Sequence, residues 1–101
     1  MACNSNIRFS HMKRSDTLEE HAGKEIRHLA QHYPYVQECN VTIDLPNKHP
    51  SDGMQYEVSL RIVMHGMILP IDKHSNSDAY IALHEAFSAA RRCLEHFKEK
   101  H

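Results

Sequence analysis

Apolar residues recur along the chain at two different spacings, and these spacings predict two helices and four strands. One stripe with steps of three or four residues follows Ser15, and a second follows Ser77 or Asp78, the two candidate caps of the last helix. Such steps place side chains on one face of an α-helix. The two stripes are Leu18, Ala22, Ile26, Leu29 and Tyr33, then Leu83, Phe87, Ala90, Leu94 and Phe97. Pro34 ends the first helix, because the residue before a proline avoids the helical region.

Between the two stripes, apolar and polar residues alternate, which is the pattern of strands with one buried face. The alternation runs from Cys39 to Leu45 and again, without a break, from Tyr56 to Met64. A polar segment rich in turn formers, residues 46–53, predicts the loop between them. A short extended piece at 7–10 predicts a further strand ahead of the first helix.

The last strand is predicted after a tight turn at His65-Gly66. It covers 67–72, and a polar connector at 73–77 leads to the second helix. Pro70 predicts an edge position, since proline cannot donate a ladder hydrogen bond. The expected architecture is one α+β domain over residues 1–101 in the order β-α-β-β-β-α. Its four-stranded, mostly antiparallel sheet would carry both helices on one face.

Cysteine usage and hydropathy narrow the location of the protein. The chain has three widely spaced cysteines, Cys3, Cys39 and Cys93. An odd set without a close pair predicts free thiols in a reducing compartment, with Cys39 and Cys93 as packing residues. No apolar run approaches the roughly 20 residues of a membrane span, and the N-terminus lacks a signal-peptide pattern. We therefore expect a cytoplasmic protein that does not contact a membrane.

The residues that could carry catalysis or hold a metal are poorly supported by their spacing. His28 and His32 could share a ligand face of a helix, but no third ligand follows at a suitable spacing. Cys93 precedes His96 by three residues without a third group to orient it. With only three glycines, the chain has no Gly-rich phosphate loop. We expect no enzyme activity, no metal and no cofactor.

Charge gives two interpretations that the residues alone leave open. The formal net charge is −1, so the chain as a whole does not attract nucleic acid. Basic residues nevertheless occur on both helices, away from the apolar stripes. They are Lys24, Arg27 and His28 on the first helix, and Arg91, Arg92, His96, Lys98 and Lys100 on the second. They could form one phosphate-binding surface, or be ordinary solvated residues beside acidic neighbours such as Glu25 and Glu95.

With this order of elements, the sequence resembles the ribosome hibernation-promoting factor family, also called ribosome-associated translation inhibitors. The likeness runs from about Ile7 to Lys100. Its most specific part is the segment from Ser77 to Phe87, followed by Ala90-Arg91-Arg92-Cys93-Leu94 and Lys98-Glu99-Lys100. Supporting pieces are Ser15 to Leu18, Cys39-Asn40-Val41 and Asn47-Lys48-His49.

The resemblance implies a fold like that of double-stranded-RNA-binding domains, which would dock on the small ribosomal subunit near the decoding region. The partner would be ribosomal RNA, bound mainly through phosphates, and the protein would exclude messenger and transfer RNA. The residues that it implies for RNA binding are Lys24, Arg27, His28, Lys48, Arg91, Arg92, His96, Lys98 and Lys100.

The near-zero charge keeps a second hypothesis open. The chain could be a non-catalytic module that keeps the fold without strong RNA binding, and that binds a protein partner or itself. In that case we expect an exposed strand edge near Ile68 to form the contact of a homo-oligomer.

Overall fold

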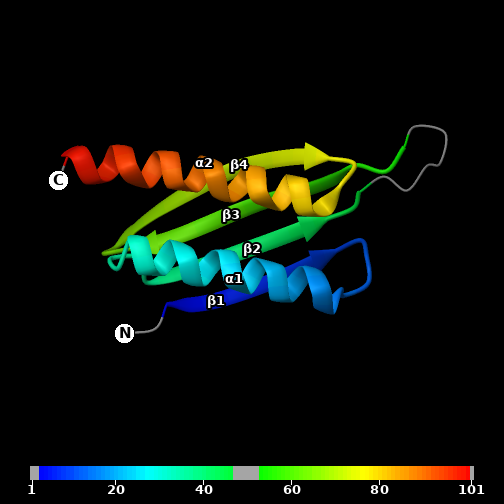
Figure 1. The fold of residues 1–101 in the computed structure, drawn as a ribbon, viewed down its shortest axis with the longest axis horizontal. Coiled ribbons are helices and arrows are strands. Elements are labelled where there is room, and N and C mark those ends of the chain that lie inside the picture. The colour runs from blue at the N-terminus through cyan, green and yellow to red at the C-terminus, as the bar shows by residue number, and fades with distance from the viewer. Residues whose placement is uncertain (1–2, 47–52, 101) are drawn as a thin grey trace.

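Four strands form one sheet, and two helices lie next to each other on one of its faces (Figure 1). The computed structural model describes residues 3–46 and 53–100, and for 98–100 the helix backbone only. The elements are β1 (Asn4–Ser10), α1 (Asp16–His32), β2 (Glu38–Asp44), β3 (Tyr56–Met64), β4 (Met67–Asn76) and α2 (Ala79–Lys100). The predicted order β-α-β-β-β-α and the helix layer are confirmed.

The sheet is mixed, with the strands in the order β1-β2-β3-β4. β1 pairs parallel with β2, in an unbroken register from Asn4 opposite Glu38 to Ser10 opposite Asp44. β2, β3 and β4 form an antiparallel meander. Since β4 is an edge strand, the position predicted from Pro70 is confirmed. The likeness to double-stranded-RNA-binding domains stays a prediction.

Local sequence explains where each helix begins and ends. The Ser15 hydroxyl accepts a hydrogen bond from the Leu18 backbone at 3.3 Å, which caps α1. The Tyr33 N–H still bonds the Leu29 carbonyl at 2.9 Å, and Pro34 follows. At α2, the Asp78 carboxylate accepts from the Tyr80 N–H at 2.9 Å. Asp78 is therefore the cap of α2.

The core lies between the sheet and the helix layer. All five residues of the first stripe are buried, as are Leu83, Phe87, Ala90 and Leu94 of the second. The alternating apolar residues of β2 and β3 meet them from the sheet. Among the described residues, no polar or charged side chain is buried. The opposite face of the sheet carries no helix and is open to solvent (Figure 1).

Two expectations from the sequence are wrong. The segment 73–77 was expected as a connector, but β4 continues to Asn76, which pairs with Tyr56. The pairing of β3 with β4 contains a register shift between Val58 and Leu60 and continues beyond it. A solvated edge strand is held by backbone hydrogen bonds, so its sequence need not alternate between apolar and polar residues. Cys93 was expected to pack, but it is exposed. The buried stripe passes through Ala90 and Leu94, and a neighbouring helix residue is rotated by about 100°.

Candidate nucleic-acid interface

The C-terminal halves of α1 and α2 bring four of the predicted RNA-binding residues together. His28 of α1 and Arg91 of α2 line one shallow hollow. Arg92 and His96 line an adjoining hollow, and Arg91 and Tyr33 belong to both. We call His28, Arg91, Arg92 and His96 the seam cluster. His28, Arg92 and His96 are exposed and Arg91 is about one-third exposed, so all four face solvent on the helix side.

Aromatic contacts position this cluster by holding the two helix ends together. The ring of Tyr33, at the end of α1, lies 6.1 Å from that of Tyr35, centroid to centroid. The Tyr35 ring lies 5.7 Å from that of Phe97 on α2. The Tyr35 hydroxyl also donates to the Leu94 carbonyl at 3.2 Å. These contacts fix the C-terminal half of α2 against α1.

A buried tyrosine places one carboxylate next to the cluster. The Tyr33 hydroxyl donates to the Glu95 carboxylate at 2.6 Å. Burial, and then this hydrogen bond, raise the pKa of Tyr33 to about 12. The hydroxyl therefore keeps its proton and stays a donor at neutral pH. Glu95 shares a hollow with Arg91 and Arg92, and its negative charge offsets part of theirs.

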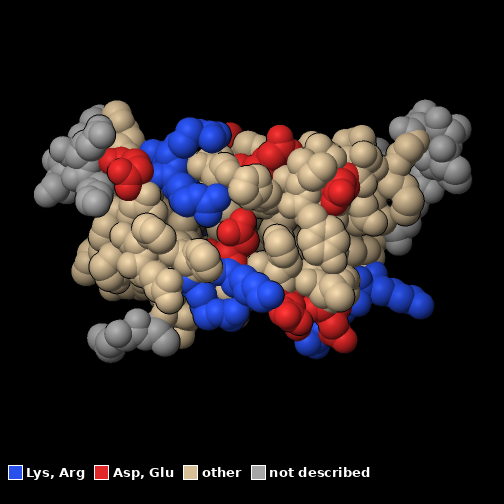
Figure 2. Space-filling model, in the orientation of Figure 1, with Lys and Arg blue, Asp and Glu red and all other residues tan. Residues whose placement is uncertain are grey.

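Other acidic residues divide the cations of the helix layer into groups. Glu25 lies 3.7 Å from the Arg91 guanidinium and 3.7 Å from the His84 ring. Lys24 lies 3.7 Å from Glu20, one turn earlier on α1. Figure 2 shows the result: Lys and Arg atoms form separate patches, with Asp and Glu atoms between them. The predicted continuous positive surface is therefore interrupted.

The remaining predicted residues lie elsewhere or beyond the described side chains. Arg27 lines a hollow on the other flank of α1, towards β1, and is not part of the seam cluster. Lys98 and Lys100 belong to the last turn of α2, and Lys48 lies outside the described residues. Within the described part of the chain, Arg27 and Arg92 have no carboxylate within 4.0 Å. Neither guanidinium is held in one of these ion pairs, so both can contact a ligand directly.

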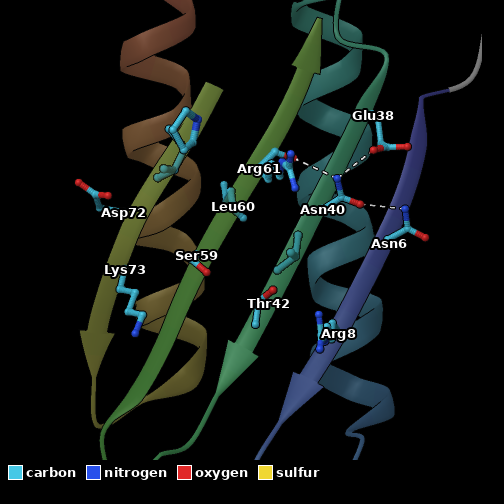
Figure 3. A pocket seen from close by; sticks show the side chains of 13 residues that line it. Asn6, Arg8, Glu38, Asn40, Thr42, Ser59, Leu60, Arg61, Asp72 and Lys73 are labelled. Carbon is cyan, nitrogen blue, oxygen red and sulfur yellow. Dashed lines mark hydrogen bonds between the residues drawn. The ribbon is translucent and has the colours of Figure 1, made fainter. Parts of the chain in front are cut away.

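The helix-free face of the sheet holds polar residues that the sequence interpretation missed (Figure 3). Asn6 donates to Asn40 at 2.9 Å, and Asn40 donates to Glu38 at 3.0 Å. Arg8 and Arg61 flank this row and line the same concave surface. The polar residues that alternate with the apolar ones along each strand would have located this face. Its mixture of positive and negative charges, however, does not indicate a particular ligand.

The described residues give no support for metal or thiol chemistry. Across 3–46 and 53–97, no group of three His, Cys, Asp or Glu side chains is arranged to hold a metal ion. Burial raises the pKa of the Cys39 thiol to about 12, which makes it a poor nucleophile. In the same part of the chain, no helix is both long and apolar enough to cross a membrane.

Comparison with known protein families identifies the family of this chain. The family model for sigma 54 modulation protein / S30EA ribosomal protein matches residues 5–101. The chain belongs to this family. The match covers nearly all of the chain and confirms the resemblance to ribosome hibernation factors that the sequence indicated. No curated protein matches the chain significantly.

Two solved structures share the fold of this S30EA family member at low sequence identity. A ribosomal subunit interface protein from Coxiella burnetii has a TM-score of 0.80 and 12% identity, with 95% of this chain and 98% of that chain covered. The N-terminal domain of Protein Y from Thermus thermophilus has a TM-score of 0.73 and 14% identity, with 93% and 98% covered. At such identities the likeness shows the fold alone.

Proposed function

We propose that this protein binds ribosomal RNA on the small subunit near the decoding region and thereby inhibits translation as a hibernation factor. Membership of the S30EA family over residues 5–101 carries the proposal. The exposed cations of the seam cluster support it, because they lie together on one accessible surface. A protein with this role acts in the cytoplasm, where ribosomes are.

In this proposal the C-terminal half of α2 makes the main phosphate contacts. Arg92 is the strongest candidate, since it is exposed and has no carboxylate within 4.0 Å among the described residues. Lys98 and Lys100 follow it along the same helix, and Lys24, Arg27 and Lys48 would extend the contact. Contacts of this kind recognise the shape of the RNA backbone more than its sequence.

Cosedimentation with small ribosomal subunits across a series of salt concentrations tests this proposal. When binding is driven by phosphate contacts, the logarithm of the affinity falls linearly with the logarithm of the salt concentration. The slope of that line is proportional to the number of contacts. We expect the Arg92→Glu/Lys98→Glu variant to bind more weakly than the wild type. Its plot of log affinity against log salt should be shallower by about 2, or about 1 for each lost contact.

The matched control is Lys13→Glu/Arg61→Glu, which changes the net charge equally. Both residues are exposed and lie away from the seam cluster. We expect this control to keep the salt slope of the wild type, with a small loss from overall charge. Equal losses in the two variants would contradict binding through the seam cluster.

A second candidate function is a protein-interaction module that binds RNA weakly. The pairing of Arg91 with Glu25 and of Lys24 with Glu20 favours it, because both pairs reduce the charge available to phosphates. Binding to ribosomal subunits that does not change with salt, and that tolerates both double variants, would support this function.

A further inference from the structure

The two edges of the sheet differ in how well they are protected against adding another strand. β4 contains Pro70, which has no N–H to donate, and its pairing with β3 contains a register shift. Prolines and bulges at an edge discourage strand addition. β1 has neither Pro nor Gly, Arg8 is its one charged residue, and its register with β2 is unbroken. β1 is therefore the edge that is ready to pair.

The hydrogen bonds at both ends of β1 show which of its backbone groups point outward. The Asn4 N–H donates to the Gln37 carbonyl at 3.0 Å, and the Ser10 carbonyl accepts from the Leu45 N–H at 3.1 Å. Backbone groups alternate in direction along a strand, so the even-numbered residues of β1 face β2. The N–H and C=O groups of Ser5, Ile7 and Phe9 therefore face away from the sheet.

We propose that β1 pairs antiparallel with β1 of a second copy of this chain, about a two-fold axis at Ile7. Ile7 then lies opposite the partner's Ile7, and Ser5 lies opposite the partner's Phe9. Each such pair exchanges two hydrogen bonds, which gives about six in all. This register uses every outward-facing backbone group of β1.

Charge also favours this register. It places Arg8 opposite the partner's Asn6, so no like charges meet. A register centred on Arg8 would bring the two guanidiniums face to face, which is unfavourable. α1 runs antiparallel to β1 (Figure 1), so its acidic first turns lie beside one end of β1 and Arg27 lies beside the other. The two-fold axis therefore brings Arg27, which lies beside Cys3 and Ser5, towards the acidic first turn of the partner's α1.

A hollow beside β1 gives the second copy a place for a large side chain. Cys3, Ser5, Gly23, Ile26 and Ala30 line it, with Arg27 at its rim. A Cβ added at Gly23 would meet only the Arg27 guanidinium, at 3.6 Å, so the hollow has room. Because the partner's Phe9 lies opposite Ser5 on the helix side, its ring enters this space. Phe9 is only partly buried within one copy, and the pairing would cover it.

The inference does not depend on the proposed ribosome binding. The pairing makes a continuous eight-stranded sheet with all helices on the same side, and it leaves the seam cluster uncovered. It also differs from the edge near Ile68 that the sequence suggested. Association is measured on the isolated protein without ribosomes, so its outcome is separate from that of the cosedimentation.

Sedimentation equilibrium over a range of protein concentrations tests the pairing with Ile7→Pro. The Ile7 N–H faces outward, so proline removes no hydrogen bond to β2. The dimer, however, loses two hydrogen bonds at its axis. We expect the wild type to form dimers, and Ile7→Pro to raise the dimer dissociation constant by about 10- to 100-fold.

Two further variants make the test decisive. Ile68→Pro is the matched change at the β4 edge, and we expect it to leave the dimer intact. Gly23→Leu keeps the backbone of β1 and fills the hollow, and we expect it to weaken the dimer while leaving the circular dichroism spectrum unchanged. A monomeric wild type, a dimer that survives Ile7→Pro and Gly23→Leu, or a dimer lost with Ile68→Pro would overturn the proposal.

Discussion

At the scale of single residues, the most consequential polar contact of the helix layer is the one between Tyr33 and Glu95. It links the end of α1 to α2 and holds a negative charge beside Arg91 and Arg92. The contact therefore serves stability and, at the same time, lowers the positive potential of the seam cluster.

Replacing Tyr33 by phenylalanine removes this hydrogen bond and keeps the ring. We expect the free energy of unfolding to fall by about 1 to 2 kcal/mol. The loss stays this small because the Glu95 carboxylate is exposed and can accept a hydrogen bond from water instead. Urea unfolding at neutral pH measures the loss. Tyr35→Phe is the control, since it removes an uncharged hydrogen bond to a carbonyl, and we expect a smaller loss. An equal or larger loss in the control would contradict this account.

Two buried ionisable groups, the Cys39 thiol and the Tyr33 hydroxyl, predict how stability changes at alkaline pH. Burial is the largest cause in both cases, and it raises the pKa of Cys39 from 9.0 and that of Tyr33 from 10.0, each to about 12. Above these ordinary values the unfolded chain releases the protons while the folded chain retains them. The stability that these two groups contribute should therefore be fully present below about pH 9 and be lost as the pH rises towards about 12.

Urea unfolding from about pH 8 to about pH 11 checks this prediction, with Cys39→Ala as the test variant. The variant lacks the buried thiol, so its stability should fall less than that of the wild type as the pH rises above about 9. Cys93→Ala is the matched control, because Cys93 is exposed, and it should follow the wild type. The same alkaline loss in all three proteins would rule out the thiol as its cause.

At the scale of elements, α2 depends on how it begins. The Asp78 carboxylate satisfies the Tyr80 N–H, while the Asp78 carbonyl accepts the Ala82 N–H at 3.0 Å. The Asn76 side chain in turn accepts from the Asp78 N–H at 2.9 Å. This chain of contacts connects the end of β4 to the start of α2, and so sets the direction in which the helix crosses the sheet.

We expect Asp78→Ala to lower the free energy of unfolding by about 1 kcal/mol, the usual cost of losing an N-cap. Ser77→Ala is the matched neighbour and should change it by less than about 0.5 kcal/mol, as exposed substitutions do. Thermal or urea unfolding of the two variants distinguishes the caps. A larger loss for Ser77→Ala would show that the helix begins one residue earlier.

The elements also show how much could be predicted from the sequence. Helix stripes and the alternation of β2 and β3 were predicted correctly, because burial imposes a period on apolar residues. The last part of β4, from Lys73 to Asn76, was missed, since an edge strand is held by backbone hydrogen bonds that leave no apolar period. Arg27 was grouped with the seam cluster, because sequence does not give the rotation of a helix about its axis.

At the scale of the whole molecule, the two proposed surfaces lie on opposite sides of α1. α1 contacts β1, whereas α2 covers β3 and β4. The seam cluster lies where the two helices meet, and the pairing edge lies beyond α1. Of the described residues proposed to bind RNA, Arg27 alone lies at the rim of the hollow beside β1, so variants of the seam cluster and variants of β1 should each leave the other surface unchanged.

Crossing the variants between the two assays tests this separation. We expect Arg92→Glu/Lys98→Glu to lose ribosome binding and to keep the dimer dissociation constant of the wild type, because neither residue lies near β1. We expect Ile7→Pro to show the reverse, with the salt slope of ribosome binding unchanged. Loss of both activities in Ile7→Pro, with its fold intact by circular dichroism, would mean that the ribosome binds the dimer or the β1 edge itself. Loss of dimerisation in the Arg92→Glu/Lys98→Glu variant would instead place the contact between copies on α2.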